Sequence, residues 1–220
     1  MKKLLICIMT LLLIIGCSAM TMAQDSTWDK TFKRSDKVDV KKVNFKNRYG
    51  ITLAGDLYTP KNAKGKLAAI AISGPFGAVK EQSSGLYAQT LAELGFITLA
   101  FDPSYTGESS GEPRHVASPD INTEDFSAAV DFLSNQPNID PEKIGILGIC
   151  GFGGMGLNAA AMDTRIKGTV TVTMYDMSRV NANGYYDAMD ENARYEQREK
   201  LNAQRTQDFK NGTYAPSSGL

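Results

Sequence analysis

The sequence lacks an excess of charge of either sign, because 24 Lys and Arg residues balance 24 Asp and Glu residues. Proteins that bind nucleic acid carry a clustered basic excess, so this balance argues against that class of partner. The sequence also lacks an apolar run long enough for a comfortable membrane span, which takes about 20 residues. Its 42% of apolar and 9% of aromatic residues instead suit one globular domain with a hydrophobic core.

The one long apolar run, residues 4–15, follows two lysines and has the layout of a secretory signal. Cleavage after Ala23 would remove residues 1–23 as a signal peptide. The alternative is a lipoprotein signal that ends at residue 16, because IIGC resembles a lipobox in which Cys17 is lipidated. An uncleaved anchor helix is the third reading. We expect an exported protein, periplasmic or secreted, that meets a membrane only through a lipid anchor at Cys17.

Cysteine and histidine are scarce, with three and one residues respectively. Cys7 lies within the signal, and Cys17 is either removed or lipidated, so Cys150 is the only free thiol expected in the mature chain. An internal disulfide is therefore excluded, although an exported protein could form one. One histidine and one thiol cannot make a zinc site, and no glycine-rich phosphate loop is present. We expect no metal and no cofactor.

The order of strands and helices points to an α/β protein. Residues 38–47 and 51–58 alternate apolar and polar side chains, which predicts an antiparallel hairpin. Continuous apolar runs predict buried parallel strands at residues 67–73, 96–101, 143–149 and 166–174. Helical spacing predicts helices between them, at residues 87–94, 123–134 and 154–162. We therefore expect a three-layer α/β/α sandwich with a mainly parallel sheet and an N-terminal antiparallel hairpin.

The same patterns divide the chain into segments. Residues 24–37 form a linker after the signal, and residues 38–176 form the α/β core. Residues 177–220 are strongly polar and are expected to form a helical cap or lid.

The sharpest candidate site is the glycine-rich turn GICGFGG at residues 148–154. A nucleophile at a strand-to-helix turn needs small neighbours, and the positive end of the following helix favours a thiolate. Counting forward from Gly148 places Cys150 in the nucleophile position. Counting back from the later glycine pair places Gly151 there, which leaves the turn without a nucleophile. In that second reading Cys150 is a buried small apolar residue.

Two further loops follow predicted strands. In Gly74–Gly77 (GPFG), Pro75 has no N–H, so Phe76 is the better donor to an oxyanion, paired with the N–H of Gly151. The alternative is an ordinary turn. The loop at residues 102–114 lies at the same sheet edge, where we expect Asp102 and Arg114 to pair and hold it.

These segments, together with FDPSYTGESSGEPR and DTRIKGTVTV, resemble the α/β-hydrolases over Val38 to Asp176. More narrowly, they resemble bacterial dienelactone-hydrolase-like and X-Pro-peptidase-like members. The resemblance implies that Cys150 is the nucleophile and that Gly151 and Phe76 form the oxyanion hole. It makes Asp176 a candidate acid, the alternative being a carboxylate that caps the segment after it.

The chain departs from the family pattern at its histidine. The family places this residue after the last strand, whereas His115 precedes Cys150, so the fold is expected to be incomplete at the C-terminus. The full-length form is expected to hydrolyse a small-molecule ester, lactone or peptide-like amide by acyl transfer. The alternatives are a non-catalytic exported binding protein on a degenerate hydrolase scaffold, and a chain that folds poorly because residues 169–173 form an unpaired edge.

Overall fold

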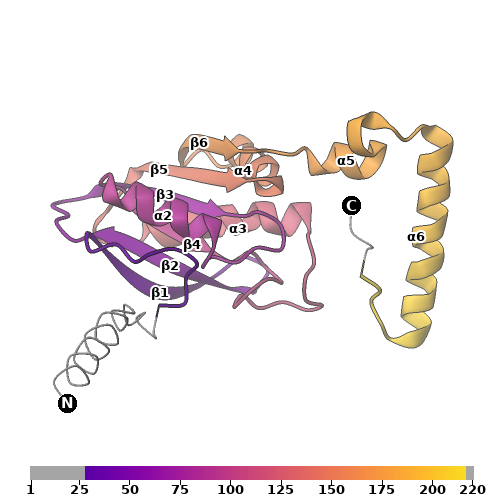
Figure 1. Ribbon diagram of the computed structural model, residues 1–220, viewed down its shortest axis with the longest axis horizontal. Coiled ribbons are helices and arrows are strands. Elements are labelled where there is room, and N and C mark those ends of the chain that lie inside the picture. The colour runs from indigo at the N-terminus through magenta and orange to yellow at the C-terminus, as the bar shows by residue number, and fades with distance from the viewer. Residues whose placement is uncertain (1–27, 217–220) are drawn as a thin grey trace, which may run out of the picture. The chain divides into compact units, whose positions relative to one another are not determined.

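The computed structural model describes residues 28–216, so the predicted signal at residues 1–23 lies outside the described residues. Within them, one sheet has the strand order β1-β2-β4-β3-β5-β6. The strands are β1 (Val38–Lys46), β2 (Thr52–Pro60), β3 (Leu67–Ser73), β4 (Ile97–Phe101), β5 (Ile139–Ile149) and β6 (Ile166–Val172). The helices are α2 (Ser83–Glu93), α3 (Pro119–Ser134), α4 (Gly151–Met162), α5 (Met177–Asn183), the 3₁₀ turn η1 (Tyr185–Asp187) and α6 (Glu191–Asn211) (Figure 1).

The pairing of the strands confirms the predicted architecture. β1 and β2 form the antiparallel hairpin, and β2 continues antiparallel onto β4. From β4 onward the pairs β4–β3, β3–β5 and β5–β6 are all parallel. The helices α2 and α4 each connect neighbouring parallel strands, so the protein is an α/β sandwich whose strand ends and the loops after them share one edge.

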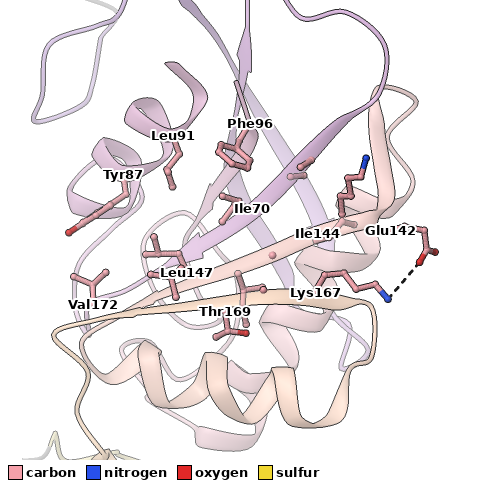
Figure 2. Close-up of a pocket in the computed structure, with 17 residues that line it drawn as sticks. Ile70, Tyr87, Leu91, Phe96, Glu142, Ile144, Leu147, Lys167, Thr169 and Val172 are labelled. Atoms are coloured by element: carbon pink, nitrogen blue, oxygen red, sulfur yellow. Dashed lines mark ion pairs between the residues drawn. The ribbon is translucent and has the colours of Figure 1, made fainter. Parts of the chain in front are cut away.

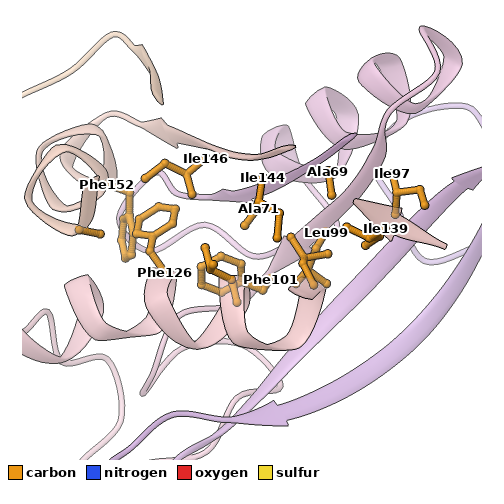
Figure 3. Packing of buried hydrophobic residues seen from close by; sticks show 14 of the residues in the cluster. Ala69, Ala71, Ile97, Leu99, Phe101, Phe126, Ile139, Ile144, Ile146 and Phe152 are labelled. Atoms are coloured by element: carbon orange, nitrogen blue, oxygen red, sulfur yellow. The ribbon is translucent and has the colours of Figure 1, made fainter. Parts of the chain in front are cut away.

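An aromatic core fills the sheet face that α3 and α4 cover. Phe101 of β4, Phe126 of α3 and Phe152 of α4 are each at most 1% exposed (Figure 3). The rings of Phe101 and Phe126 meet edge to face with centroids 5.5 Å apart, and those of Phe126 and Phe152 are 6.4 Å apart. Each buried Phe side chain contributes roughly 1.5–3 kcal/mol of hydrophobic stabilisation. Because Phe152 belongs to the first turn of α4, this core holds the turn between β5 and α4 in place.

The opposite sheet face is covered less completely. Ala88 and Ala92 of α2 pack with Ile72 and Leu147, which alternate with the residues of the aromatic core. Between α2 and the edge strand β6, an apolar trough of about 710 Å³ stays open (Figure 2). Its lining includes Ile70, Tyr87, Leu91, Phe96, Ile144, Leu147, Val170 and Val172. None of the four predicted site residues lines this trough.

Helix α3 begins four residues earlier than the predicted start at residue 123. Ser118 is its N-cap, with the hydroxyl accepting from the Ile121 N–H, and Pro119 occupies the first turn. Serine before proline is a strong start signal, because the hydroxyl satisfies an unpaired N–H and proline needs none. Thr123 and Asp125 are buried inside the helix instead. The predicted start was therefore wrong.

The polar segment after residue 176 forms helices, the longest being α6. Asp190 caps α6 by accepting from the Ala193 N–H, and Gly212 ends it in a left-handed conformation. No residue of α6 is buried, and Phe209 is 90% exposed. Of the helices in residues 28–216, none is both long enough and apolar enough to cross a membrane.

Candidate active site

The turn between β5 and α4 holds Cys150 in a backbone conformation that L-residues rarely adopt. Its φ is 57° and its ψ is −127°. The Cys150 N–H donates to the carbonyl of Val172 on β6 at 2.9 Å, and its carbonyl accepts from Gly153 at 3.0 Å and Tyr175 at 3.3 Å. Such a conformation costs about 1–3 kcal/mol and persists only where its surroundings impose it. Here hydrogen bonds to both sides of the turn impose it, and Cys150 is half-buried.

The glycines around Cys150 are required by close contacts. A Cβ on Gly148 would lie 2.2 Å from the carbonyl oxygen of Phe152, and one on Gly151 would lie 2.3 Å from Cε2 of Phe76. A Cβ on Gly153 would meet the Met174 side chain at 2.9 Å. The positive φ falls on Cys150 and not on Gly151, which favours the forward count from Gly148 as the alignment of the turn.

The loop after β3 lies directly against this turn. Gly74 has a φ of 98°, and a Cβ there would lie 2.4 Å from the carbonyl oxygen of Ile149. The Phe76 ring covers Gly151 and packs edge to face on Phe152, with centroids 5.2 Å apart. The structure therefore brings both predicted oxyanion donors, Phe76 and Gly151, into one contact.

The N–H groups of these two residues are free to bind a ligand. Within residues 28–216, neither the Phe76 N–H nor the Gly151 N–H donates a hydrogen bond to another protein group. Gly151 is the first residue of α4, where the first N–H groups of a helix have no partner inside the helix. Unpaired N–H donors are the groups that stabilise a developing oxyanion when two of them point at the same oxygen.

Asp176 lies close to this turn, but its carboxylate has a structural partner. It is the N-cap of α5 and accepts from the Arg179 N–H at 2.9 Å. It also lines a cavity of about 390 Å³ together with Gly151, Met174 and Met177. The capping role that the sequence left open is thus present, and a role as the acid stays a prediction.

His115 lies on another loop of the same edge. Its φ is 61°, and its N–H donates to the carbonyl of Tyr105 at 2.8 Å. With Phe76, Asn122 and Phe152 it lines a separate cavity of about 120 Å³. Among the described residues, its imidazole makes no hydrogen bond to Cys150.

The predicted pair of Asp102 and Arg114 does not form. Arg114 donates instead to the carbonyls of Gly107, Ser109 and Gly111, which closes the loop on itself. Asp102 bonds the Lys80 ammonium at 3.1 Å, and both side chains are fully buried. The Arg114 guanidinium fits several carbonyls at once, whereas the adjacent ends of β3 and β4 bring Lys80 to Asp102. Lys80 was missed because a lysine in a polar stretch carries no sign of burial.

A second buried carboxylate, Asp125 of α3, ties two loops to its own helix. Its two oxygens accept from the Asn47 amide at 2.9 Å, from the Ser104 hydroxyl and N–H at 2.7 and 2.8 Å, and from the Asn122 amide at 3.1 Å. Burial raises the pKa of Asp125, and these hydrogen bonds oppose that rise. In residues 28–216, no group of three His, Cys, Asp or Glu side chains has the arrangement of a metal site.

Comparison with known proteins places the chain in a family. The family model described as X-Pro dipeptidyl-peptidase (S15 family) matches residues 49–212. The uncharacterized protein PA2218 of Pseudomonas aeruginosa is 62% identical over 201 residues, which cover 91% of this chain and 54% of that protein. The crystal structure of PA2218 has a TM-score of 0.84 at 61% identity and covers 89% of this chain and 63% of that one.

Two more distant relatives are also hydrolases by name. Thiohydrolase aneE of Aspergillus aculeatus is 36% identical over 140 residues, 64% of this chain and 43% of that protein. The α/β hydrolase GrgF from Penicillium sp. sh18 has a TM-score of 0.60 at 25% identity, over 77% of this chain and 55% of that one. The chain thus spans about half the length of the curated relatives it matches. It belongs to the S15 family of X-Pro dipeptidyl-peptidases within the α/β-hydrolase superfamily.

Proposed function

We propose that the protein is an exported hydrolase that cleaves a small-molecule ester, lactone or amide by acyl transfer to Cys150. The carrying observation is the backbone of Cys150, which has a φ of 57° at a strand-to-helix turn lined by glycine. Unpaired N–H groups on Phe76 and Gly151 beside this turn support the same reaction. The name thiohydrolase, given to a relative 36% identical, supports hydrolytic chemistry on this scaffold.

The reaction proceeds in two halves. The Cys150 thiolate attacks the acyl carbonyl carbon, a C–S bond forms, and the carbonyl electron pair moves to oxygen, where the Phe76 and Gly151 N–H groups donate to it. Collapse of this intermediate expels the alcohol or amine, which takes up a proton, and leaves a thioester on Cys150. Water then adds to the thioester, the thiolate leaves, and the carboxylic acid is released.

A general base is needed to activate water in the second half. His115 precedes the turn and lines a different cavity from Asp176. We infer that the base is a histidine in the part of the relatives' length that this chain does not match, and that Asp176 orients it from the cavity beside Gly151. The apolar run at residues 4–15 supports export, by either of the two signal routes.

The test is a single-turnover reaction with p-nitrophenyl acetate. We expect a burst of p-nitrophenolate that approaches one equivalent, an acetyl group located on Cys150 by peptide mass spectrometry, and little turnover afterwards. The Cys150→Ala variant should give no burst. Absence of acetylation at Cys150 in the folded protein would refute the proposal for the nucleophile. Rapid sustained turnover that depends on Cys150 would instead refute the proposal that the base lies outside these residues.

A further inference from the structure

Lys80 is a charged residue that is almost completely buried, since only 1% of it is exposed. Its ammonium contacts three carboxylates, Glu81 at 2.6 Å, Glu108 at 2.7 Å and Asp102 at 3.1 Å. We call these four residues the Lys80 cluster. Lysine is almost never fully buried without a charged partner, because removing the ammonium from water is costly. The carboxylates around Lys80 must therefore compensate for the cost of burying its ammonium.

The cluster ends the loop that carries Phe76. This loop leaves β3 at Ser73, whose hydroxyl donates to the Phe101 carbonyl at 3.1 Å. At its other end, the Lys80 N–H donates to Oδ1 of Asp102 at 2.7 Å, and the Lys80 ammonium binds Oδ2 of the same carboxylate. The backbone N–H and the ammonium of Lys80 thus each bind one carboxylate oxygen of Asp102. Phe76 lies between these two attachment points.

Asp102 is itself a fixed anchor at the end of β4. Its N–H donates to the Ala54 carbonyl on β2 at 2.9 Å, and its carbonyl accepts from the Ser109 hydroxyl at 2.7 Å. The Glu108 N–H donates to its Oδ2 at 2.9 Å. The loop is therefore tied to a part of the sheet that is bonded on several sides.

The charges of the cluster keep Lys80 protonated. Burial lowers the pKa of Lys80, but hydrogen bonds to Glu108, Glu81 and Asp102 outweigh this and raise it above its ordinary value. Lys42 binds the other oxygen of Glu108 at 3.1 Å and holds that carboxylate in place. Burial raises the pKa of Asp102, and its hydrogen bonds to Glu108 and Lys80 oppose that rise.

We propose that Lys80 is a positioning residue for the oxyanion hole: through Asp102 it holds the Phe76 N–H where it stabilises the oxyanion formed at Cys150. This inference rests on the proposed acyl transfer. An oxyanion donor works only within about 2.7–3.1 Å of the oxyanion, and losing one donor lowers the rate by about 10²- to 10³-fold. A loop freed at Lys80 loses this donor without any change at the thiol.

Two reactions of the same thiol separate this role from a general structural one. Acetylation by p-nitrophenyl acetate passes through an oxyanion, whereas alkylation by iodoacetamide displaces iodide and forms none. The ratio of the two rates at Cys150 therefore reports on the oxyanion hole alone. We expect Lys80→Met to lower the acetylation rate by about 10²-fold while alkylation stays within the same order of magnitude.

A second variant guards against misfolding, because Lys80→Met leaves the buried Asp102 carboxylate without its cationic partner. The double variant Lys80→Met with Asp102→Asn removes the opposing buried charge and should show the same loss in the ratio. Lys143→Met removes a lysine that pairs with Asp140 at the surface, and it should leave the ratio unchanged. If the folded double variant keeps the wild-type ratio, or if both reactions slow equally, the positioning role is refuted. Failure of the wild-type protein to be acetylated would instead refute the proposed function itself.

Discussion

Gly151→Ala tests the contact on which the oxyanion hole depends. The new Cβ would lie 2.3 Å from Cε2 and 2.8 Å from Cδ2 of Phe76, and 2.9 Å from Cγ of Met177. Carbon atoms in contact lie about 3.5–4.0 Å apart, so the Phe76 ring must retreat by more than about 1 Å. The ring cannot simply swing away, because Phe152 packs against it with centroids 5.2 Å apart.

The displacement passes to the loop that carries the Phe76 N–H. A misplacement of about 1 Å lowers a catalysed rate by about 10²-fold, which corresponds to about 2.7 kcal/mol of transition-state stabilisation. We expect acetylation of Cys150 in Gly151→Ala to slow by this factor in a stopped-flow assay of p-nitrophenolate release. Alkylation by iodoacetamide, measured in parallel, should change far less.

Gly156→Ala is the matched control in the same helix. A Cβ at this position would lie 3.4 Å from Cδ1 of Ile146, an ordinary contact, and alanine favours the helix by about 1 kcal/mol relative to glycine. Its acetylation rate should equal that of the wild type. A Gly151→Ala protein that is folded and acetylates at the wild-type rate would show that the Phe76 loop plays no part in the reaction.

Three further predictions concern stability in urea unfolding. Cys150→Gly should be more stable than Cys150→Ala by about 1 kcal/mol, because glycine tolerates the positive φ that strains any other residue here; equal stabilities would contradict the strain. Asp125→Asn should lower the free energy of unfolding by about 2–3 kcal/mol, because an oxygen that accepts from buried donors is replaced by a donor. The control Asp131→Asn removes an exposed ion pair with Arg165 and should lower the free energy of unfolding by less than about 1 kcal/mol. Hydrogen bonds to Lys80 and Lys42 lower the pKa of Glu108. The ionised form of Glu108 therefore stabilises the fold at pH values above its ordinary pKa of 4.5. This stabilisation is lost as the pH falls through the lowered pKa. The Glu108→Gln variant should therefore lose less stability than the wild type on acidification, and an unchanged pH profile would refute this assignment.

Much of the architecture was readable from local sequence patterns. Continuous apolar runs and alternating segments marked the strands correctly, because burial on two faces or on one leaves a direct trace in composition. Helix starts were less certain. Helix α3 begins at Pro119 because the Ser118 hydroxyl accepts from the Ile121 N–H and proline at the first position needs no acceptor.

The candidate site was predicted in part. The glycines around Cys150 indicate a crowded turn, but their spacing is compatible with two alignments, which place the nucleophile position at Cys150 or at Gly151. The backbone angles place the positive φ on Cys150 and so favour one of the two alignments. The roles of Phe76 and Gly151 as donors and of Cys150 as nucleophile stay predictions that the acetylation assays address.

By itself, the sequence determined the order of strands and helices and the position of the glycine-rich turn, because periodicity and small residues act over a few neighbouring positions. Only the tertiary structure decided that Asp102 binds Lys80 rather than Arg114 and that His115 and Asp176 line different cavities. These relations depend on which strands lie side by side in the sheet. Lys80 and Asp102 are 22 residues apart in the chain, and they meet because β3 and β4 end at the same edge.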